Sequence, residues 1–494
     1  MKMRFAAFWL VLSLMLFAAH AGAEEPIVVN PGSAPKTEEE TAAMVDDILK
    51  EAMENEEIKT AFADEVTVVT EVVPSEWFAG EPQTVYTLSY GGKELHFLKE
   101  TVGEADESGQ YPLYITLHGG GGGPEEGNND QWINMFSYYK RSVANGIYIA
   151  VRGVSDTWDL HFREETYPLL DALITHMTVT EHADPNRVYL LGFSAGGDGV
   201  YQLAPRLADR FAAVNMSSGH PNGVSLLNMA NCPICLQTGI RDYYSEDARR
   251  SVRSAEFEKT LEDYRKEYGF GYEHQVWIHV PEGHNYIDYT DSQSFVLADP
   301  ESFAEREEAE DMLTAMLQVV REYLGTDDIV YLSYWLDGDN EAFDKAMTAL
   351  VSGEFGLELT EANTNAVRWV SQYVRDPAPS EVVWDLGTRA AGREITSWYW
   401  LEAEPSVNEG IIRASFDSDS NTYTVTPDEA VNGDFAILFL AGMVDTGRPV
   451  TIVTPEGEYT LQVNPSEELA FESFLERMDP DRICVGKILY SELK

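Results

Sequence analysis

The chain has 494 residues, with 34 lysines and arginines against 84 aspartates and glutamates, so its formal net charge is −50. A field of that sign repels nucleic acid and anionic lipid, which excludes both as expected partners. With 44% hydrophobic residues the chain can fill a packed core, and its length predicts a main domain with at least one accessory domain.

The first 23 residues have the pattern of an export signal. Lys2 and Arg4 precede an apolar run at 5–19, and the small residues AGA at 21–23 form a cleavage site. A membrane anchor is the alternative, but the apolar run is short for a membrane span. We therefore expect a signal peptide at 1–23 and a secreted protein, extracellular or periplasmic.

Residues 24–65 are acidic with helical spacing and predict an N-terminal helical segment. From 66 to 287, short apolar runs alternate with amphipathic stretches, a pattern typical of a sheet covered by helices on both faces. We therefore expect an α/β catalytic core with a mainly parallel sheet. The predicted strands are 66–73, 84–90, 95–98, 113–117, 147–151, 188–191, 211–216, 234–237 and 276–280, and the predicted helices are 164–182, 195–207 and 245–268.

The alternation of short apolar runs and amphipathic stretches is interrupted at 288–366. Helical spacing over 313–324 and 343–351 predicts a helical insertion there. Such an insertion could cover the active site as a lid or simply extend the packing, and the sequence leaves both open. Residues 367–379 are expected to end the core and to contain a proline-rich linker, after which 380–494 shows strand-like runs separated by turn signals. This last region predicts a small C-terminal all-β domain.

The pentapeptide GFSAG at 192–196 fits the G-x-S-x-G pattern between a predicted strand and a predicted helix. That context is typical of a nucleophile elbow, a tight turn that projects a serine hydroxyl at the end of a sheet. An ordinary glycine-rich turn is the alternative. We expect Ser194 to be the nucleophile and the amide of Ala195 to be one donor of an oxyanion hole.

The run HGGGGGP at 118–124 directly follows a predicted strand. Glycines let backbone amides turn toward the oxyanion of a tetrahedral intermediate. We expect the amide of Gly119 or Gly120 to be the second donor, with His118 supporting the loop. A phosphate-binding loop is the alternative, but the Lys-Ser/Thr ending of that motif is absent.

A serine nucleophile needs an oriented base, and in this fold the chain order is serine, acid, histidine. Asp242 ends the stretch GIRD after one predicted strand, and His284 lies in EGHN after the next. We expect these residues to be the acid and the base. Asp247 is a rival acid, and His279 and His220 are rival bases, although His279 lies inside a strand pattern.

Two further side chains are candidates for substrate binding: Trp158, in a loop on the expected active face, and His220, which a proline follows. Cys232 and Cys235 would lie too far apart in an extended strand for a disulfide. A turn could bring them together, but we expect buried thiols. No second pair of ligands accompanies them, so we expect neither a metal site nor a cofactor.

The glycine loop, the stretch DPNRVYLLGFSAGGDGVYQLAPRLADRF, the GIRD loop and the GH pair together resemble secreted α/β-hydrolases related to polyhydroxybutyrate depolymerases, feruloyl and acetyl-xylan esterases and dienelactone hydrolases. The resemblance extends over residues 85–287. It implies hydrolysis of ester or acyl bonds without a metal, with Ser194, Asp242 and His284 as the catalytic triad. The expected substrate is a small-molecule or polysaccharide-linked ester, such as an acyl or feruloyl ester, or a polyester. The insertion and the acidic surface depart from the family, and substrate choice depends on such pocket walls.

Two other functions stay open. A serine peptidase similar to prolyl oligopeptidase would use the same triad, although too few residues precede Ser194 for the usual N-terminal propeller. A carbohydrate-binding protein with an inert hydrolase core would use the β domain, where Trp384, Trp398 and Trp400 could stack on sugars. The acyl group, the alcohol and the oligomeric state do not follow from the sequence.

Overall fold

The computed structural model describes residues 26–240, 242, 249–279, 282–284, 293–303, 358–390 and 395–493. The predicted signal peptide at 1–23 and the predicted helices at 313–324 and 343–351 lie outside these residues. Within the described part of the chain, no helix is long and apolar enough to cross a membrane.

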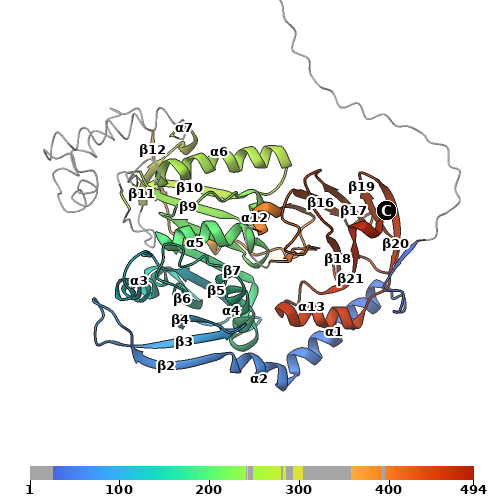
Figure 1. Ribbon diagram of the computed structural model, residues 1–494, viewed down its shortest axis with the longest axis horizontal. Helices are drawn as coiled ribbons and strands as arrows, with labels where there is room; N and C mark the ends of the chain where they lie inside the picture. Colours follow the sequence, from blue (N-terminus) through green and yellow to red (C-terminus); the bar gives the residue numbers. More distant parts are fainter. Residues whose placement is uncertain are drawn as a thin grey trace, which may run out of the picture.

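An 11-stranded sheet forms one side of the molecule, and two smaller sheets lie beside it (Figure 1). The strand order of the large sheet is β12-β11-β10-β9-β8-β7-β5-β6-β4-β3-β2. Its strands are β2 (Val66–Val72), β3 (Pro82–Tyr90), β4 (Lys93–Val102), β5 (Tyr111–Leu117), β6 (Gly146–Val151), β7 (Ala183–Phe193), β8 (Ala213–Ser217), β9 (Ile234–Gly239), β10 (His274–His279), β11 (Gln293–Leu297) and β12 (Leu359–Asn363).

This sheet is mixed, which corrects the prediction of a mainly parallel one. The neighbours among β6, β5, β7, β8, β9 and β10 pair in parallel, whereas the strand pairs on both sides of this centre are antiparallel. The physical reason is the length of the connections. A two-residue turn, such as the one between β3 and β4, joins only antiparallel strands, whereas a parallel pair needs a longer crossover.

Helices cover both faces of the parallel centre. The apolar side chains of α4 (Thr166–Glu181), α5 (Ala195–Leu203) and α6 (Arg250–Tyr268) belong to one core cluster, and those of α3 (Glu125–Tyr138) and α11 (Ala366–Val370) belong to a second. The strands alternate between the two clusters because successive side chains point to opposite faces. A parallel centre covered on both faces is an α/β arrangement, consistent with the α/β-hydrolase fold expected from the sequence.

The described parts of the range predicted as a helical insertion, 288–366, contain two strands, β11 and β12. β11 and β12 pair with each other and extend the large sheet beyond β10. A short helix, α7 (Pro300–Phe303), follows β11. These strands are short and add to a sheet edge, so backbone pairing rather than a strong apolar pattern defines them.

The C-terminal region contains a four-stranded sheet, ordered β14-β15-β18-β21, and five strands of a six-stranded sheet, ordered β1-β20-β19-β17-β16-β13, whose edge strand β1 (Ile27–Val29) comes from the N-terminal segment. Its strands are β13 (Glu381–Asp385), β14 (Ser397–Trp398), β15 (Leu401–Glu402), β16 (Ile411–Asp417), β17 (Thr422–Pro427), β18 (Ala436–Leu440), β19 (Val450–Thr454), β20 (Gly457–Val463) and β21 (Cys484–Leu489). The region is not all-β as predicted, since it also contains α12 (Leu386–Ala390) and α13 (Glu467–Arg477). Ser466 caps α13 by accepting the N–H of Leu469, a local signal that was available in the sequence.

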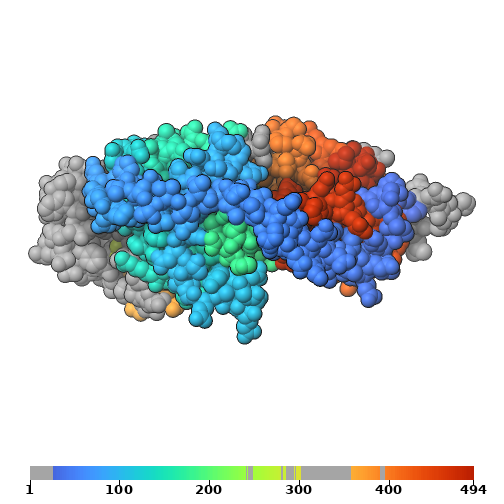
Figure 2. All heavy atoms as spheres, turned by 90° about the horizontal axis from the view of Figure 1, so that it is seen from below, coloured from blue at the N-terminus to red at the C-terminus, as the bar shows by residue number. Residues whose placement is uncertain are grey.

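The N-terminal segment connects the two regions. Its strand β1 (Ile27–Val29) pairs in parallel with β20, and α1 (Glu38–Glu54) and α2 (Glu56–Asp64) pack on α13 and α4, respectively. Figure 2 shows this segment, in blue, lying across the face of the molecule seen from below. The predicted helical segment is therefore docked on the body of the protein rather than free.

Candidate active site

Ser194 lies at the turn between β7 and α5, with φ 57° and ψ −119°, a conformation that costs energy for a residue other than glycine. Two glycines allow this turn. A Cβ atom at Gly192 would lie 2.1 Å from the carbonyl oxygen of Gly196, and one at Gly196 would lie 2.0 Å from that of Leu117. Only glycine fits either position, so the G-x-S-x-G pattern here has the geometry of a nucleophile elbow.

His284 joins the other two residues predicted for the triad. Its Nε2 lies 2.9 Å from Oγ of Ser194, and its Nδ1 lies 3.0 Å from Oδ2 of Asp242. The Asp242 side chain is fully buried, and that of His284 is 20% exposed. Because a carboxylate can only accept a hydrogen bond, Nδ1 carries the hydrogen of this pair and Nε2 faces the serine hydroxyl as an acceptor.

The rival bases have other partners. His279 is buried in β10 with its Nε2 3.0 Å from Oε1 of Gln237, and burial lowers its pKa to about 3, which makes it a poor base. His220 shares a hydrogen bond with Asn222. It borders a pocket whose other lining residues are Pro221, Gly223, Val224, Arg253, Glu256, Phe257 and Thr260. The rival acid Asp247 lies outside the described residues.

The glycine loop runs alongside Ser194. A Cβ atom at Gly119 would lie 3.2 Å from Cβ of Ser194. The N–H of Gly121 donates to Oδ1 of Asn128 at 2.8 Å, whereas the N–H groups of Gly119 and Gly120 have no acceptor among the described residues. Ala195 begins α5, so its N–H has no acceptor within the helix. Unpaired amides on both sides of Ser194 suit an oxyanion hole.

His118 supports the loop and is not a base. Its Nδ1 donates to the carbonyl oxygen of Gly119 at 2.6 Å, and its Nε2 accepts the N–H of Gly153 at 3.1 Å. Burial, together with the nearby His161 and Arg152, holds its pKa well below the ordinary value. The ring is therefore neutral, as the two opposite hydrogen-bonding roles of its nitrogens require.

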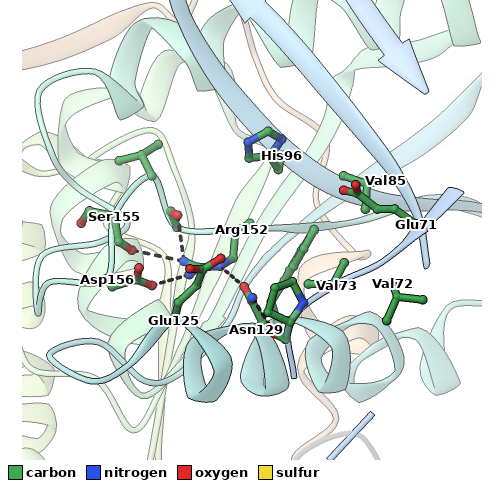
Figure 3. Close-up of a pocket in the computed structure, with 14 residues that line it drawn as sticks. Glu71, Val72, Val73, Val85, His96, Glu125, Asn129, Arg152, Ser155 and Asp156 are labelled. Atoms are coloured by element: carbon green, nitrogen blue, oxygen red, sulfur yellow. Dashed lines mark hydrogen bonds and ion pairs between the residues drawn. The ribbon is translucent and has the colours of Figure 1, made fainter. Parts of the chain in front are cut away.

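A polar network behind the loop was not predicted from the sequence. Figure 3 shows Arg152, the residue that directly follows β6, in an ion pair with Asp156 and a hydrogen bond to Asn129 of α3. Asn128 joins this network by donating to Asp156 at 2.9 Å. Burial works against the charge of Asp156, but the hydrogen bonds from Arg152 and Asn128 outweigh it and lower the pKa of that carboxyl. No local motif marks these residues, since two separate segments, α3 and the chain that follows β6, contribute them.

The remaining candidates lie as follows. Trp158 is 59% exposed and its Cα lies 3.2 Å from where a Cβ of Gly121 would be, so it stands beside the glycine loop. Cys232 and Cys235 are buried and are not joined by a disulfide, as expected. The tryptophans proposed to stack on sugars, Trp384, Trp398 and Trp400, are fully buried in the core and present no ring to a ligand.

Two curated proteins that are similar in sequence to part of this chain are named as esterases. No family model matches the chain. A probable feruloyl esterase C of Aspergillus terreus is 33% identical over 118 residues, which are 23% of this chain and 42% of that protein. The putative esterase NocK of Nocardia uniformis is 31% identical over 117 residues, which are 22% of this chain and 33% of that protein. The matched segment thus spans less than half the length of either relative, and the predicted resemblance to esterases is confirmed.

Among solved structures, LpqC, a poly(3-hydroxybutyrate) depolymerase from Bordetella parapertussis, is 17% identical with a TM-score of 0.34, covering 42% of this chain and 85% of that one. A thermostable esterase is 17% identical with a TM-score of 0.30, covering 51% of this chain and 63% of that one. Because these similarities are distant, the fold assignment depends on the strand order and helix placement described above.

Proposed function

We propose that the protein is a serine hydrolase that cleaves carboxylic esters. The observation that carries this proposal is the continuous hydrogen-bonded chain from Ser194 through His284 to the buried Asp242, with the serine at a strained elbow. The similarity to two curated esterases favours an ester over an amide as the bond that is cleaved.

In the proposed reaction, His284 takes the proton of Ser194 as Oγ attacks the ester carbonyl. The carbonyl electron pair moves to oxygen, where the amides of the glycine loop and of Ala195 stabilise the charge. The bond to the alcohol then breaks, and the alcohol leaves with the proton from His284. Water repeats the sequence and releases the acid, while Asp242 keeps the imidazole in the required tautomer.

The proposed substrate is a small-molecule or polysaccharide-linked ester, such as an acyl or feruloyl ester, or a polyester, and the protein is proposed to be secreted. The names of the relatives support the ester class, and the export pattern in the first 23 residues supports secretion. The exposed ring of Trp158 beside the glycine loop is available as a wall for the substrate. The net charge of −50 disfavours a polyanionic substrate.

The test is hydrolysis of a series of chromogenic acyl esters by the full chain and by two variants. We expect Ser194→Ala to lower kcat by several orders of magnitude. Asp242→Asn keeps the shape of the site but favours the wrong tautomer, and we expect it to lower kcat by about 10⁴-fold. Thermal unfolding of each variant controls for loss of structure.

Three results would contradict the proposal. Full activity of Ser194→Ala would remove the nucleophile. Activity of the wild type on aminoacyl amides but on no ester would replace the esterase by a peptidase. A folded wild type that cleaves neither class would leave the hydrolase core inert.

A further inference from the structure

Three side chains hold three successive peptide groups of the glycine loop. The carbonyl of His118 accepts a hydrogen bond from Nε2 of His161 at 2.8 Å, and the carbonyl of Gly119 accepts one from Nδ1 of His118 at 2.6 Å. At the far end, Asn128 accepts the N–H of Gly121 at 2.8 Å. In a trans peptide group the C=O and N–H point in opposite directions, so a side chain that holds the carbonyl also sets the direction of the N–H.

This geometry links His161 to the N–H of Gly119. The carbonyl of His118 and the N–H of Gly119 belong to the same peptide group, so His161 holds that N–H on the side away from its own ring. Gly119 is buried and lies against Ser194, whereas Gly120 is exposed. Of the two donors left open by the sequence, Gly119 therefore fits the oxyanion hole better.

In the folded protein, the buried ring of His161 acts as a hydrogen-bond donor. Its side chain is 1% exposed, and its ring packs edge-on against that of His118 with centroids 4.6 Å apart. Burial lowers its pKa to about 3, so the ring is neutral and carries its hydrogen on Nε2. Its Nδ1 is buried with no partner among the described residues, a cost that an apolar side chain of the same size would not have.

We propose that His161 is a positioning residue that aims the N–H of Gly119 into the oxyanion hole, while Asn128 secures the other end of the loop. This inference rests on the proposed function. It goes beyond the triad, because His161 touches neither the nucleophile nor the base in any hydrogen bond of the described chain and acts through the backbone of His118.

The test measures how fast a fluorophosphonate probe labels Ser194, beside ester turnover. In labelling, the bond from phosphorus to Oγ forms as the P–F bond breaks, fluoride leaves, and His284 takes the serine proton. The phosphoryl oxygen occupies the oxyanion hole during this step, so the rate reports on the hole whichever substrate the protein cleaves.

Two variants distinguish the hydrogen bond that His161 donates from the packing of its side chain. His161→Leu removes the donor, and we expect it to slow labelling and lower kcat by about 10- to 100-fold, less than the 10²- to 10³-fold that loss of a whole donor costs. KM should change by less than about twofold, since the hole acts on the transition state. His161→Gln keeps an N–H within reach and should stay within about threefold of the wild type.

The matched control is His176→Leu. His176 is also a buried histidine, and its Nδ1 donates to a backbone carbonyl, that of Phe62, at 2.9 Å, remote from the loop. We expect it to destabilise the protein without slowing the labelling of Ser194.

The proposal is overturned if folded His161→Leu labels at the wild-type rate, if His161→Gln is as slow as His161→Leu, or if His176→Leu slows labelling equally. A wild type that is labelled at Ser194 but cleaves no ester would contradict the ester proposal alone, because the comparison of labelling rates still decides the role of His161. A wild type that is not labelled would overturn both.

Discussion

The close packing of α5 on His161 can be tested at Gly199. A Cβ atom there would lie 2.8 Å from Cβ of His161 and 2.9 Å from Cδ1 of Leu117. Both distances are well below the ~3.5–4.0 Å at which carbon atoms pack. Alanine usually stabilises a helix interior by up to about 1 kcal/mol over glycine, whereas overpacking a core costs about 1–3 kcal/mol. Because both contacts are shorter than 3.0 Å, the overpacking cost falls in the upper part of its range, at ~2–3 kcal/mol. After subtraction of the helix gain of about 1 kcal/mol, we expect Gly199→Ala to lower the free energy of unfolding by roughly 1–2 kcal/mol.

Gly127 provides the matched control, since it also lies in a helix, α3, but has free space. A Cβ atom there would meet only Cγ of Pro124, at 3.9 Å. We expect Gly127→Ala to raise the free energy of unfolding by about 0.5–1 kcal/mol. Urea denaturation measures both variants, and labelling of Ser194 measures the loop. Labelling should slow in Gly199→Ala, where His161 is displaced, and stay unchanged in Gly127→Ala.

Two outcomes would refute this reasoning. If Gly199→Ala is as stable as the wild type, the contact with His161 relaxes without cost. If Gly199→Ala is destabilised yet labels at the wild-type rate, the oxyanion donor does not depend on where His161 lies.

Two further predictions concern buried ionisable groups. Burial lowers the pKa of His161 to about 3 in the folded protein, against ~6.5 when unfolded, so between these values the unfolded chain binds one more proton. The contribution of the neutral His161 ring to stability is complete above about pH 6.5 and is lost as the pH falls toward 3. In urea titrations at pH 4.5–6, we expect His161→Gln to reduce the slope of the unfolding free energy against pH by about 1.4 kcal/mol per pH unit. An unchanged slope would count against a neutral buried ring. Arg477 pairs with Asp209 at 2.6 Å, with side chains 6% and 1% exposed, so Arg477→Leu should cost about 3–5 kcal/mol because the buried carboxylate loses its hydrogen-bonded partner. Lys36→Ala, which breaks a pair with the 71% exposed Glu467, should cost less than about 1 kcal/mol, and similar losses in the two variants would contradict the assignment of a buried pair.

Most elements of the α/β core could be predicted because each carries its own local pattern. The strands at 113–117 and 147–151 are short apolar runs, and both are central strands of the sheet. The mixed arrangement was not predictable in the same way. Whether a strand pairs in parallel depends on which neighbour it meets, and that is decided by connections and packing across the whole sheet.

Short edge elements account for other differences. β1 has three residues, and β11 and β12 have five each. Such strands form because an open sheet edge offers backbone donors and acceptors, so their own residues show little strand preference. The helix at 467–477, by contrast, had a capping serine and acidic residues in its first turn, which sequence analysis could have used.

The sequence by itself determined the nucleophile elbow, because the close approach of strand and helix admits only glycine at 192 and 196. It also indicated Asp242 and His284, since both follow strands that end at the same edge of the sheet. Only the tertiary structure decided that His284 reaches Ser194, 90 residues away, and that His161 and Asn128 hold the glycine loop. The reason is that local pattern governs backbone conformation and burial, whereas a contact between distant segments depends on strand order and register, which no single segment encodes.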